Sequence, residues 1–186
     1  MALLDNAQQY IGDNQVGQIS QQLGINPNAA RTAIAAALPM IVGGLARHAS
    51  SPTGADAIKQ AASAHANITE NVSSAFQAGP PADVASTGGL LARVFGQHRD
   101  AVEQSVQQAS GLESDKARKL LLMLSPVVLG VLARRQFGNQ NVSQIDAGQL
   151  AGALHQEAQN AQRNSPNIGG VLGKLLSGGG AEAPRA

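Results

Sequence analysis

The stretch GINPNAARTAIAAALPMIVGGLAR, residues 24–47, occurs a second time as GLESDKARKLLLMLSPVVLGVLAR, residues 111–134. The two copies align without a gap when the second is read 87 positions after the first. The identities fall mainly on Gly, Pro and Arg, which have backbone or charge roles. Chance similarity between two Ala- and Leu-rich helices explains such identities poorly, so we infer an internal duplication. The identical pairs are Gly24/Gly111, Ala30/Ala117, Arg31/Arg118, Pro39/Pro126, Gly43/Gly130, Leu45/Leu132, Ala46/Ala133 and Arg47/Arg134.

The residues around both copies predict long helices that continue through a proline. Gly24 fits the position just past a helix, where a positive φ is cheapest for glycine. Asn26 and Pro27 then fit the N-cap and the first position of the next helix. The apolar register continues through Pro39 and Pro126, so we expect two kinked helices and not four short ones.

The helix containing Pro126 is apolar on more than one face, which is typical of a buried helix. We therefore expect the two kinked helices to pack against each other about a pseudo-two-fold axis. Gly43, Gly44 and Gly130 would let them approach closely.

The composition favours an all-α protein with an aliphatic core. Ala, Leu and Gln are abundant, and the chain of 186 residues has one Tyr, three Phe and no Trp. The net charge of +1 is not the basic footprint of a protein held to DNA mainly by phosphate contacts. The absence of Cys excludes disulfides and thiolate chemistry.

The start MALLDNAQQY lacks the charged region and long apolar run of a signal peptide. The longest apolar run, residues 120–133, is interrupted and is shorter than the ~17–25 residues that span a bilayer. We expect a soluble, cytoplasmic protein without a transmembrane segment.

The predicted organisation is two tandem, pseudo-symmetric helical repeats of about four helices each, fused into one unit and followed by a flexible Gly-rich tail. In the tail, Ile168, Val171, Leu172, Leu175 and Leu176 could form one short apolar segment. The predicted boundaries are 1–76 for the first repeat, 77–89 for a Gly/Pro linker, 90–163 for the second repeat and 164–186 for the tail. Further helices are expected near 2–11, up to Leu23, near 54–66, through Ile68, Val72 and Phe76, and near 146–162.

The motifs LGINPNAARTAIAAALPMIVGGLAR, SSPTGADAIKQA, GGLLARVFGQ and SGLESDKARKLLLMLSPVVLGVLAR resemble a bacterial family of unknown function, the DUF-937 family of YidB-like proteins. The resemblance covers roughly residues 1–160. It implies an all-helical bacterial protein with no established activity or cofactor, so it transfers no catalytic residue to this chain.

The sequence contains no recognised catalytic or metal-binding motif. None of His48, His65, His98 and His155 stands four residues from another histidine, and HQEAQ lacks the second histidine of a zinc-protease helix. Neither a phosphate-binding loop nor a GxSxG nucleophile elbow is present. We therefore expect no catalytic residue, no metal ligand and no cofactor.

Arginines at the ends of the duplicated helices offer two interpretations. In the simpler one, Arg47 and Arg134 offset the helix dipoles, while Arg31 and Arg118 pair with nearby carboxylates. In the other, Arg31, Arg47, Arg118, Arg134 and Arg135 contact an anion or a partner at the pseudo-two-fold axis.

The segment Ile19–Ile34 has the small residue, turn glycine and apolar spacing of a helix-turn-helix. If it bound DNA, Asn26, Asn28, Arg31 and Thr32 would face the groove. A plain helical hairpin is favoured, because the segment has one arginine and the second copy replaces the contact residues.

The leading functional prediction is a non-enzymatic helical interaction module that binds a protein partner or itself, with a homodimer expected. The alternatives are a nucleic-acid-binding regulator that uses the hairpin, and an enzyme or ligand-binding protein with an unfamiliar Arg-lined site.

Overall fold

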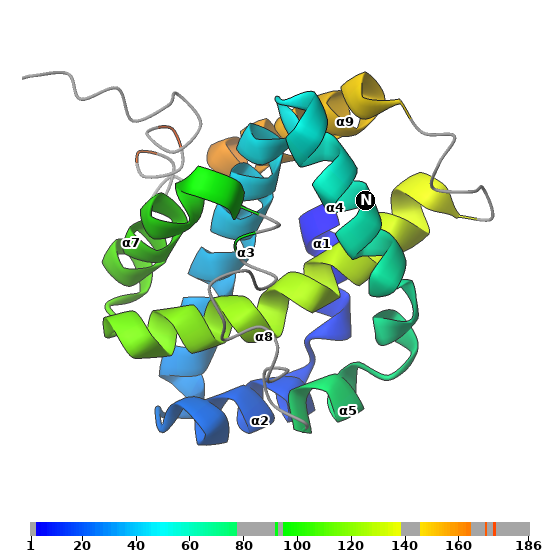
Figure 1. Cartoon of the computed structure of the whole chain (residues 1–186). Helices are drawn as coiled ribbons and strands as arrows, with labels where there is room; N and C mark the ends of the chain where they lie inside the picture. The colour runs from blue at the N-terminus through cyan, green and yellow to red at the C-terminus, as the bar shows by residue number, and fades with distance from the viewer. Residues whose placement is uncertain are drawn as a thin grey trace, which may run out of the picture.

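The computed structural model describes residues 3–77, 92, 95–138, 146–164, 170 and 173. All regular elements within these residues are helical, which confirms the predicted all-α class (Figure 1). The longer helices are α1 (Leu3–Tyr10), α2 (Asp13–Leu23), α3 (Pro27–Ala49), α4 (Pro52–Ala64), α7 (Arg99–Ser110), α8 (Ser114–Leu132) and α9 (Ala147–Asn164). The shorter turns are η1 (Ala66–Glu70), α5 (Val72–Gln77), η3 (Gly96–His98) and the π-helical turn η4 (Ala133–Phe137).

Helices α2 and α3 form the first hairpin, and its turn follows the predicted chemistry. Gly24 ends α2 with φ of 63°, in the left-handed region. The side chain of Asn26 accepts a hydrogen bond from the backbone N–H of Ala29 at 2.7 Å, and Pro27 is the first residue of α3. The predicted C-terminal glycine, N-cap and first-turn proline are therefore confirmed.

Helices α7 and α8 form the second hairpin, which has the same backbone outline. Gly111 ends α7 with φ of 68°, and Glu113 precedes α8 in an extended conformation without a side-chain cap. Both α3 and α8 are continuous through their internal residues Pro39 and Pro126. The expectation of one continuous helix through each proline, and not two short ones, is confirmed.

Helices α3 and α8 cross and contact each other at the centre of the molecule (Figure 1). The contacts of α3 with α9 and α7 are more extensive than its contacts with α8. Helix α8 is covered in turn by η1, α1 and α4, besides α7. Each hairpin's long helix is therefore packed mainly by elements from outside that hairpin.

Gly44 and Gly130 do not bring α3 and α8 together, contrary to the prediction for these two residues, because other segments lie against them. A Cβ at Gly44 would lie 2.6 Å from the ring of Phe95 and 2.8 Å from Val102. The missing side chain of Gly44 therefore admits the segment that enters α7, and it is this segment that approaches closely.

The prediction of one helix through Ile68, Val72 and Phe76 is wrong, because the chain forms η1 and α5 as separate turns. Asn71 lies between them with φ of −137°. Turn η1 packs on α8 at Gly130, where an added Cβ would lie 2.5 Å from Ile68. The break lets the two turns contact α8 and α2 in different directions.

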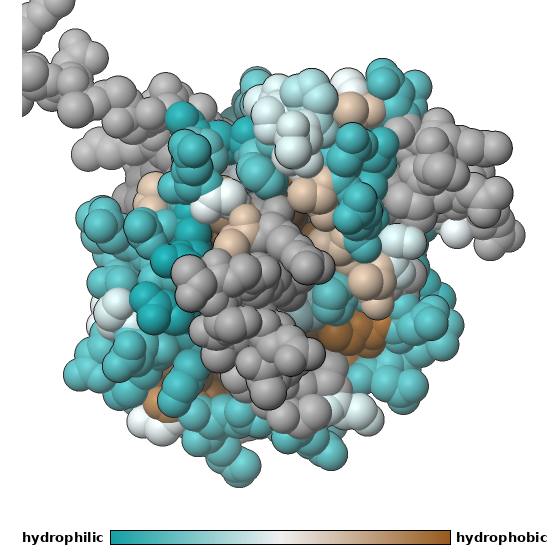
Figure 2. All heavy atoms as spheres, in the orientation of Figure 1, coloured by the Kyte–Doolittle hydropathy of each residue, from teal (hydrophilic) through white to brown (hydrophobic). Residues whose placement is uncertain are grey.

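Helix α3 also meets the length and hydropathy criteria for a membrane span, with a mean hydropathy of 1.5. In this structure, 78% of the apolar stretch is buried against other parts of the protein. Among the coloured residues that Figure 2 shows, hydrophilic ones predominate over apolar ones. The apolar length of α3 is thus accounted for by contacts with the other helices.

Several predicted features lie outside the described residues. These are most of the linker 77–89, the apolar tail residues Ile168, Val171, Leu172, Leu175 and Leu176, and the C-terminal end of the tail.

Candidate functional site

The five arginines singled out in the sequence do not converge on one site. Arg31 lies in the first turns of α3 and Arg47 in the last, more than about 20 Å apart along the helix axis at about 1.5 Å per residue. Arg118 and Arg134 are separated similarly along α8 and η4. The hydrogen-bonding partners are Asp13 for Arg31, His98 for Arg47, Glu103 for Arg118, Tyr10 and Thr69 for Arg134, and Glu157 for Arg135.

Arg31 and Arg118 pair with carboxylates, as the simpler interpretation expected, but in different environments. The Arg31–Asp13 pair is exposed, with 58% and 85% of the side-chain surfaces accessible. Glu103 is buried and lies 3.1 Å from the guanidinium of Arg118, with Arg99 at 3.8 Å. The hydrogen bond that Arg118 donates to Glu103, and then the charge of that carboxylate, raise the pKa of Arg118. The first pair is therefore a surface contact, whereas the second is anchored in the protein.

Arg47 and Arg134 each extend to an element far away in the sequence. The Nε of Arg47 donates to the ring of His98, with both ring nitrogens at 3.1 Å. Arg134 donates to the hydroxyls of Tyr10 and Thr69 at 3.2 and 3.3 Å. Burial, followed by the charges of Arg47 and His48, lowers the pKa of His98.

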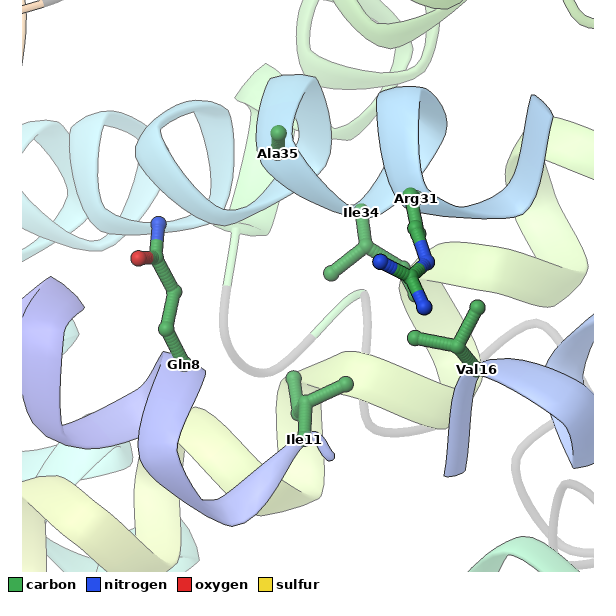
Figure 3. Close-up of a pocket in the computed structure, with 6 residues that line it drawn as sticks. All are labelled: Gln8, Ile11, Val16, Arg31, Ile34 and Ala35. Atoms are coloured by element: carbon green, nitrogen blue, oxygen red, sulfur yellow. The ribbon is translucent and has the colours of Figure 1, made fainter. Parts of the chain in front are cut away.

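A pocket of about 210 Å³ opens on the surface where α1, α2 and α3 meet (Figure 3). Its floor is apolar, and Ile11, Val16 and Ile34 there are each less than a tenth exposed. Arg31 reaches across beside Val16, and Gln8 enters from α1 at the other end. The complete lining is Gln8, Ile11, Val16, Arg31, Ile34 and Ala35.

Sequence reasoning identified Arg31 but missed the pocket around it. The signal was Ala35, a small residue on the exposed side of α3 one turn from Arg31. Its counterpart 87 positions later is Leu122, which is buried. At these corresponding positions the first hairpin has a small exposed residue and the second a large buried one, so the two hairpins differ in surface shape there.

The residues proposed for DNA contact are all exposed, but most have local roles. Asn26 caps α3, Arg31 pairs with Asp13, and the hydroxyl of Thr32 donates to the carbonyl of Asn28 at 3.1 Å. The carboxylate of Asp13 also places negative charge at this face. Asn26, Arg31 and Thr32 are therefore engaged in contacts within the hairpin, and the structure gives them no specific arrangement for contacting DNA.

Among the residues that the structure describes, no three His, Cys, Asp or Glu side chains gather as a metal site would require. His65 and His155 each hydrogen-bond a carbonyl of their own helix, at 2.7 and 2.9 Å. The pocket is thus the feature of the described structure on which a binding site can be argued.

The fold defines an all-helical protein in which two long helices cross at the centre. A small apolar pocket lies at the first of its two hairpins. Residues 5–135 match the family model described as "Bacterial protein of unknown function (DUF937)", and the chain belongs to this family. No curated protein and no solved structure matches the chain.

Proposed function

We propose that this chain is a non-enzymatic helical interaction module, and that the α1–α2–α3 pocket is its docking site for a protein partner. The observation that carries the proposal is the pocket's apolar floor, open to solvent beside an exposed arginine. The occupant we propose is an apolar side chain of the partner with a carboxylate next to it.

The size of the pocket favours a side chain over a cofactor or a drug-sized ligand. Small-molecule sites usually enclose about 300–1,000 Å³, whereas this pocket measures about 210 Å³. Apolar anchor side chains that fill such depressions supply much of the affinity in protein interfaces. Ile11, Val16 and Ile34 provide the matching apolar surface.

The charge at the rim favours a partner carboxylate. Arg31 is paired with Asp13 in an exposed ion pair, and such pairs contribute about 0–1 kcal/mol. Arg31 can therefore exchange Asp13 for a carboxylate of the partner at small cost. Burial of the new pair beneath the partner would strengthen it, because solvent screening falls.

The proposal is tested by NMR titration of the full-length protein with N-acetyl-leucine, which joins an apolar side chain to a carboxylate. We expect shift changes at Ile11, Val16 and Ile34, and weaker binding of N-acetyl-leucinamide, which lacks the carboxylate. Ala35→Leu should abolish the changes, because it fills the pocket with the residue type found at the counterpart position.

Ala101→Leu, the same change at an exposed position of α7, is the matched control and should bind as the wild type does. Shift changes that persist in Ala35→Leu, or that map elsewhere on the protein, would contradict the docking site. Light scattering of the wild type and of Ala35→Leu then distinguishes a different protein from a second copy of this chain as the partner. If the wild type is a dimer and Ala35→Leu a monomer, the partner is a second copy of this chain.

Nucleic-acid binding through the first hairpin is the alternative, supported by the exposure of Asn26, Asn28, Arg31 and Thr32. A steep fall of DNA affinity with salt would support it. Failure to bind duplex DNA at low salt would remove it.

We also propose that the chain is a tandem repeat with boundaries at residues 1–76, 77–89, 90–163 and 164–186. Both hairpins end their first helix at a left-handed glycine and carry a proline inside the second. The arginine near the C-terminal end of each long helix contacts the other proposed repeat: Arg47 contacts His98, and Arg134 contacts Tyr10. At an offset of 87 positions these two partners differ by one residue, which supports a reciprocal arrangement.

A further inference from the structure

We propose that the contact between Arg47 and His98 is a pH-sensitive clasp. In acid it releases the segment containing η3 from the end of α3 and exposes Phe95. The device is independent of the proposed docking pocket, because neither residue lines that pocket.

The hydrogen bond requires a neutral imidazole. An arginine Nε–H can only donate, so the ring of His98 must offer an unprotonated nitrogen as the acceptor. A protonated imidazole has two N–H donors and no acceptor, and it carries the same charge as the guanidinium. Protonation of His98 therefore converts an attractive contact into a repulsive one.

The charged groups around His98 are mostly positive. Helix α3 supplies Arg47 and His48, and α7 supplies Arg99 and Asp100. The carboxylate of Asp100 pairs with Arg99 at 3.5 Å, and Arg99 also lies 3.8 Å from Glu103. Asp100 is the acidic group closest in sequence to His98, but its negative charge is partly neutralised by Arg99. His48 adds further repulsion whenever it is protonated.

The direction of the pH effect follows from the lowered pKa of His98 in the folded protein. The unfolded or released segment binds the proton more readily than the clasped one. The clasp is therefore fully stable above about pH 6.5, the ordinary histidine pKa. It weakens as the pH falls below that value towards the lower pKa of the folded state.

The segment released by the clasp holds a buried aromatic ring. Phe95 is fully buried against Gly44, and a Cβ at Gly44 would lie 2.6 Å from the ring. Gly96 follows with φ of 54° and lies directly against the ring of His48. Opening of the clasp would uncover both Phe95 and the depression at Gly44, which together form an apolar surface absent at neutral pH.

The corresponding contact at the other long helix lacks this response. Arg134 donates to the hydroxyls of Tyr10 and Thr69, which do not become cations on acidification. Only one of these two arginine contacts therefore titrates, so mild acid would loosen one side of the molecule while the other stays closed.

Hydrogen exchange of the full-length protein, measured by mass spectrometry at about pH 7.5 and about pH 5 and corrected for intrinsic rates, tests the clasp. Protection of residues 95–102 should fall at the lower pH by up to about tenfold for each unit by which the pKa of His98 is lowered. Protection of α2 should stay constant. His98→Gln, whose side-chain carbonyl accepts from Arg47 without titrating, should lose the response.

His155→Gln is the matched control, because the ring of His155 hydrogen-bonds the carbonyl of Ala151 within its own helix, α9. This variant should keep the acid response. Equal loss of protection in His98→Gln and wild type would overturn the clasp, as would no loss in the wild type.

A second measurement tests the clasp even if His98→Gln fails to fold. NMR titration of the wild-type His98 ring should give a pKa below about 6.5, and Arg47→Gln should raise it. A wild-type value at or above 6.5 would overturn the proposal.

Discussion

The two hairpins have the same backbone outline but different surfaces. The first has an exposed Arg31–Asp13 pair and, beside it, a pocket left open by Ala35. In the second, Arg118 binds the buried Glu103, and Leu122 is buried at the position that corresponds to Ala35. Glycine and proline positions thus keep the chain's course, while the side chains between them determine whether a face is open or closed. Changes at paired positions can separate these two roles.

The largest contrast is expected at the residues before the two prolines. Leu38 and Ser125 are both fully buried, but the hydroxyl of Ser125 has no hydrogen-bond partner among the residues that the structure describes. Leu38→Ala should destabilise the protein by about 2–5 kcal/mol through lost contacts and a cavity. Ser125→Ala should be neutral or stabilise by about 1 kcal/mol, because it removes an unsatisfied group. Urea denaturation measures both, and a large loss for Ser125→Ala would show that a partner such as bound water satisfies the hydroxyl.

Glycines that admit a neighbouring segment should respond next most strongly. A Cβ at Gly130 would lie 2.8 Å from the carbonyl oxygen of His65, which is backbone and cannot rotate away. Gly130→Ala should therefore cost about 1–3 kcal/mol. Gly17, inside α2, is the control: an added Cβ there would have no described atom within 4 Å outside the adjacent backbone of its own helix, so Gly17→Ala should stabilise by about 1 kcal/mol. Thermal unfolding of the two variants measures both effects. A stabilised Gly130→Ala would show that helix propensity outweighs the close approach of η1 at this position.

The smallest contrast is expected between the two ion pairs. Glu103→Gln should cost about 1.5 kcal/mol, because the neutral amide oxygen accepts a weaker hydrogen bond from Arg118 than the buried carboxylate does. Asp13→Asn should cost about 0.5 kcal/mol or less, because its pair with Arg31 is exposed. Raising the salt concentration should reduce the effect of Asp13→Asn further. Equal costs for the two variants would contradict the difference in burial.

Much of the fold follows from local chemistry that is visible in the sequence. Gly24, Asn26 and Pro27 specify the turn of the first hairpin because each has a backbone role that few other residues fulfil. The continuation of α3 through Pro39 followed from the unbroken apolar register.

The misses concern contacts between distant segments. The spacing of Ile68, Val72 and Phe76 fits one helix, but packing on α8 and α2 divides the segment at Asn71. Close approach at Gly44 was expected, but the identity of the neighbour, Phe95, depends on the tertiary path of the chain. The pocket was missed for the same reason, since it is formed by three helices.

The packing of α3 against helices from the second half of the chain also constrains how the chain folds during synthesis. Helix α3 makes its most extensive contacts with α9 and α7, which leave the ribosome long after α3 itself. Much of the apolar surface of α3 therefore stays without its most extensive native contacts until α7 and α9 are made, and contacts of such large sequence separation form slowly. A nascent chain with this topology is exposed to aggregation until its last described helix emerges. Chaperone dependence of newly made protein would be the expected cellular sign of this packing.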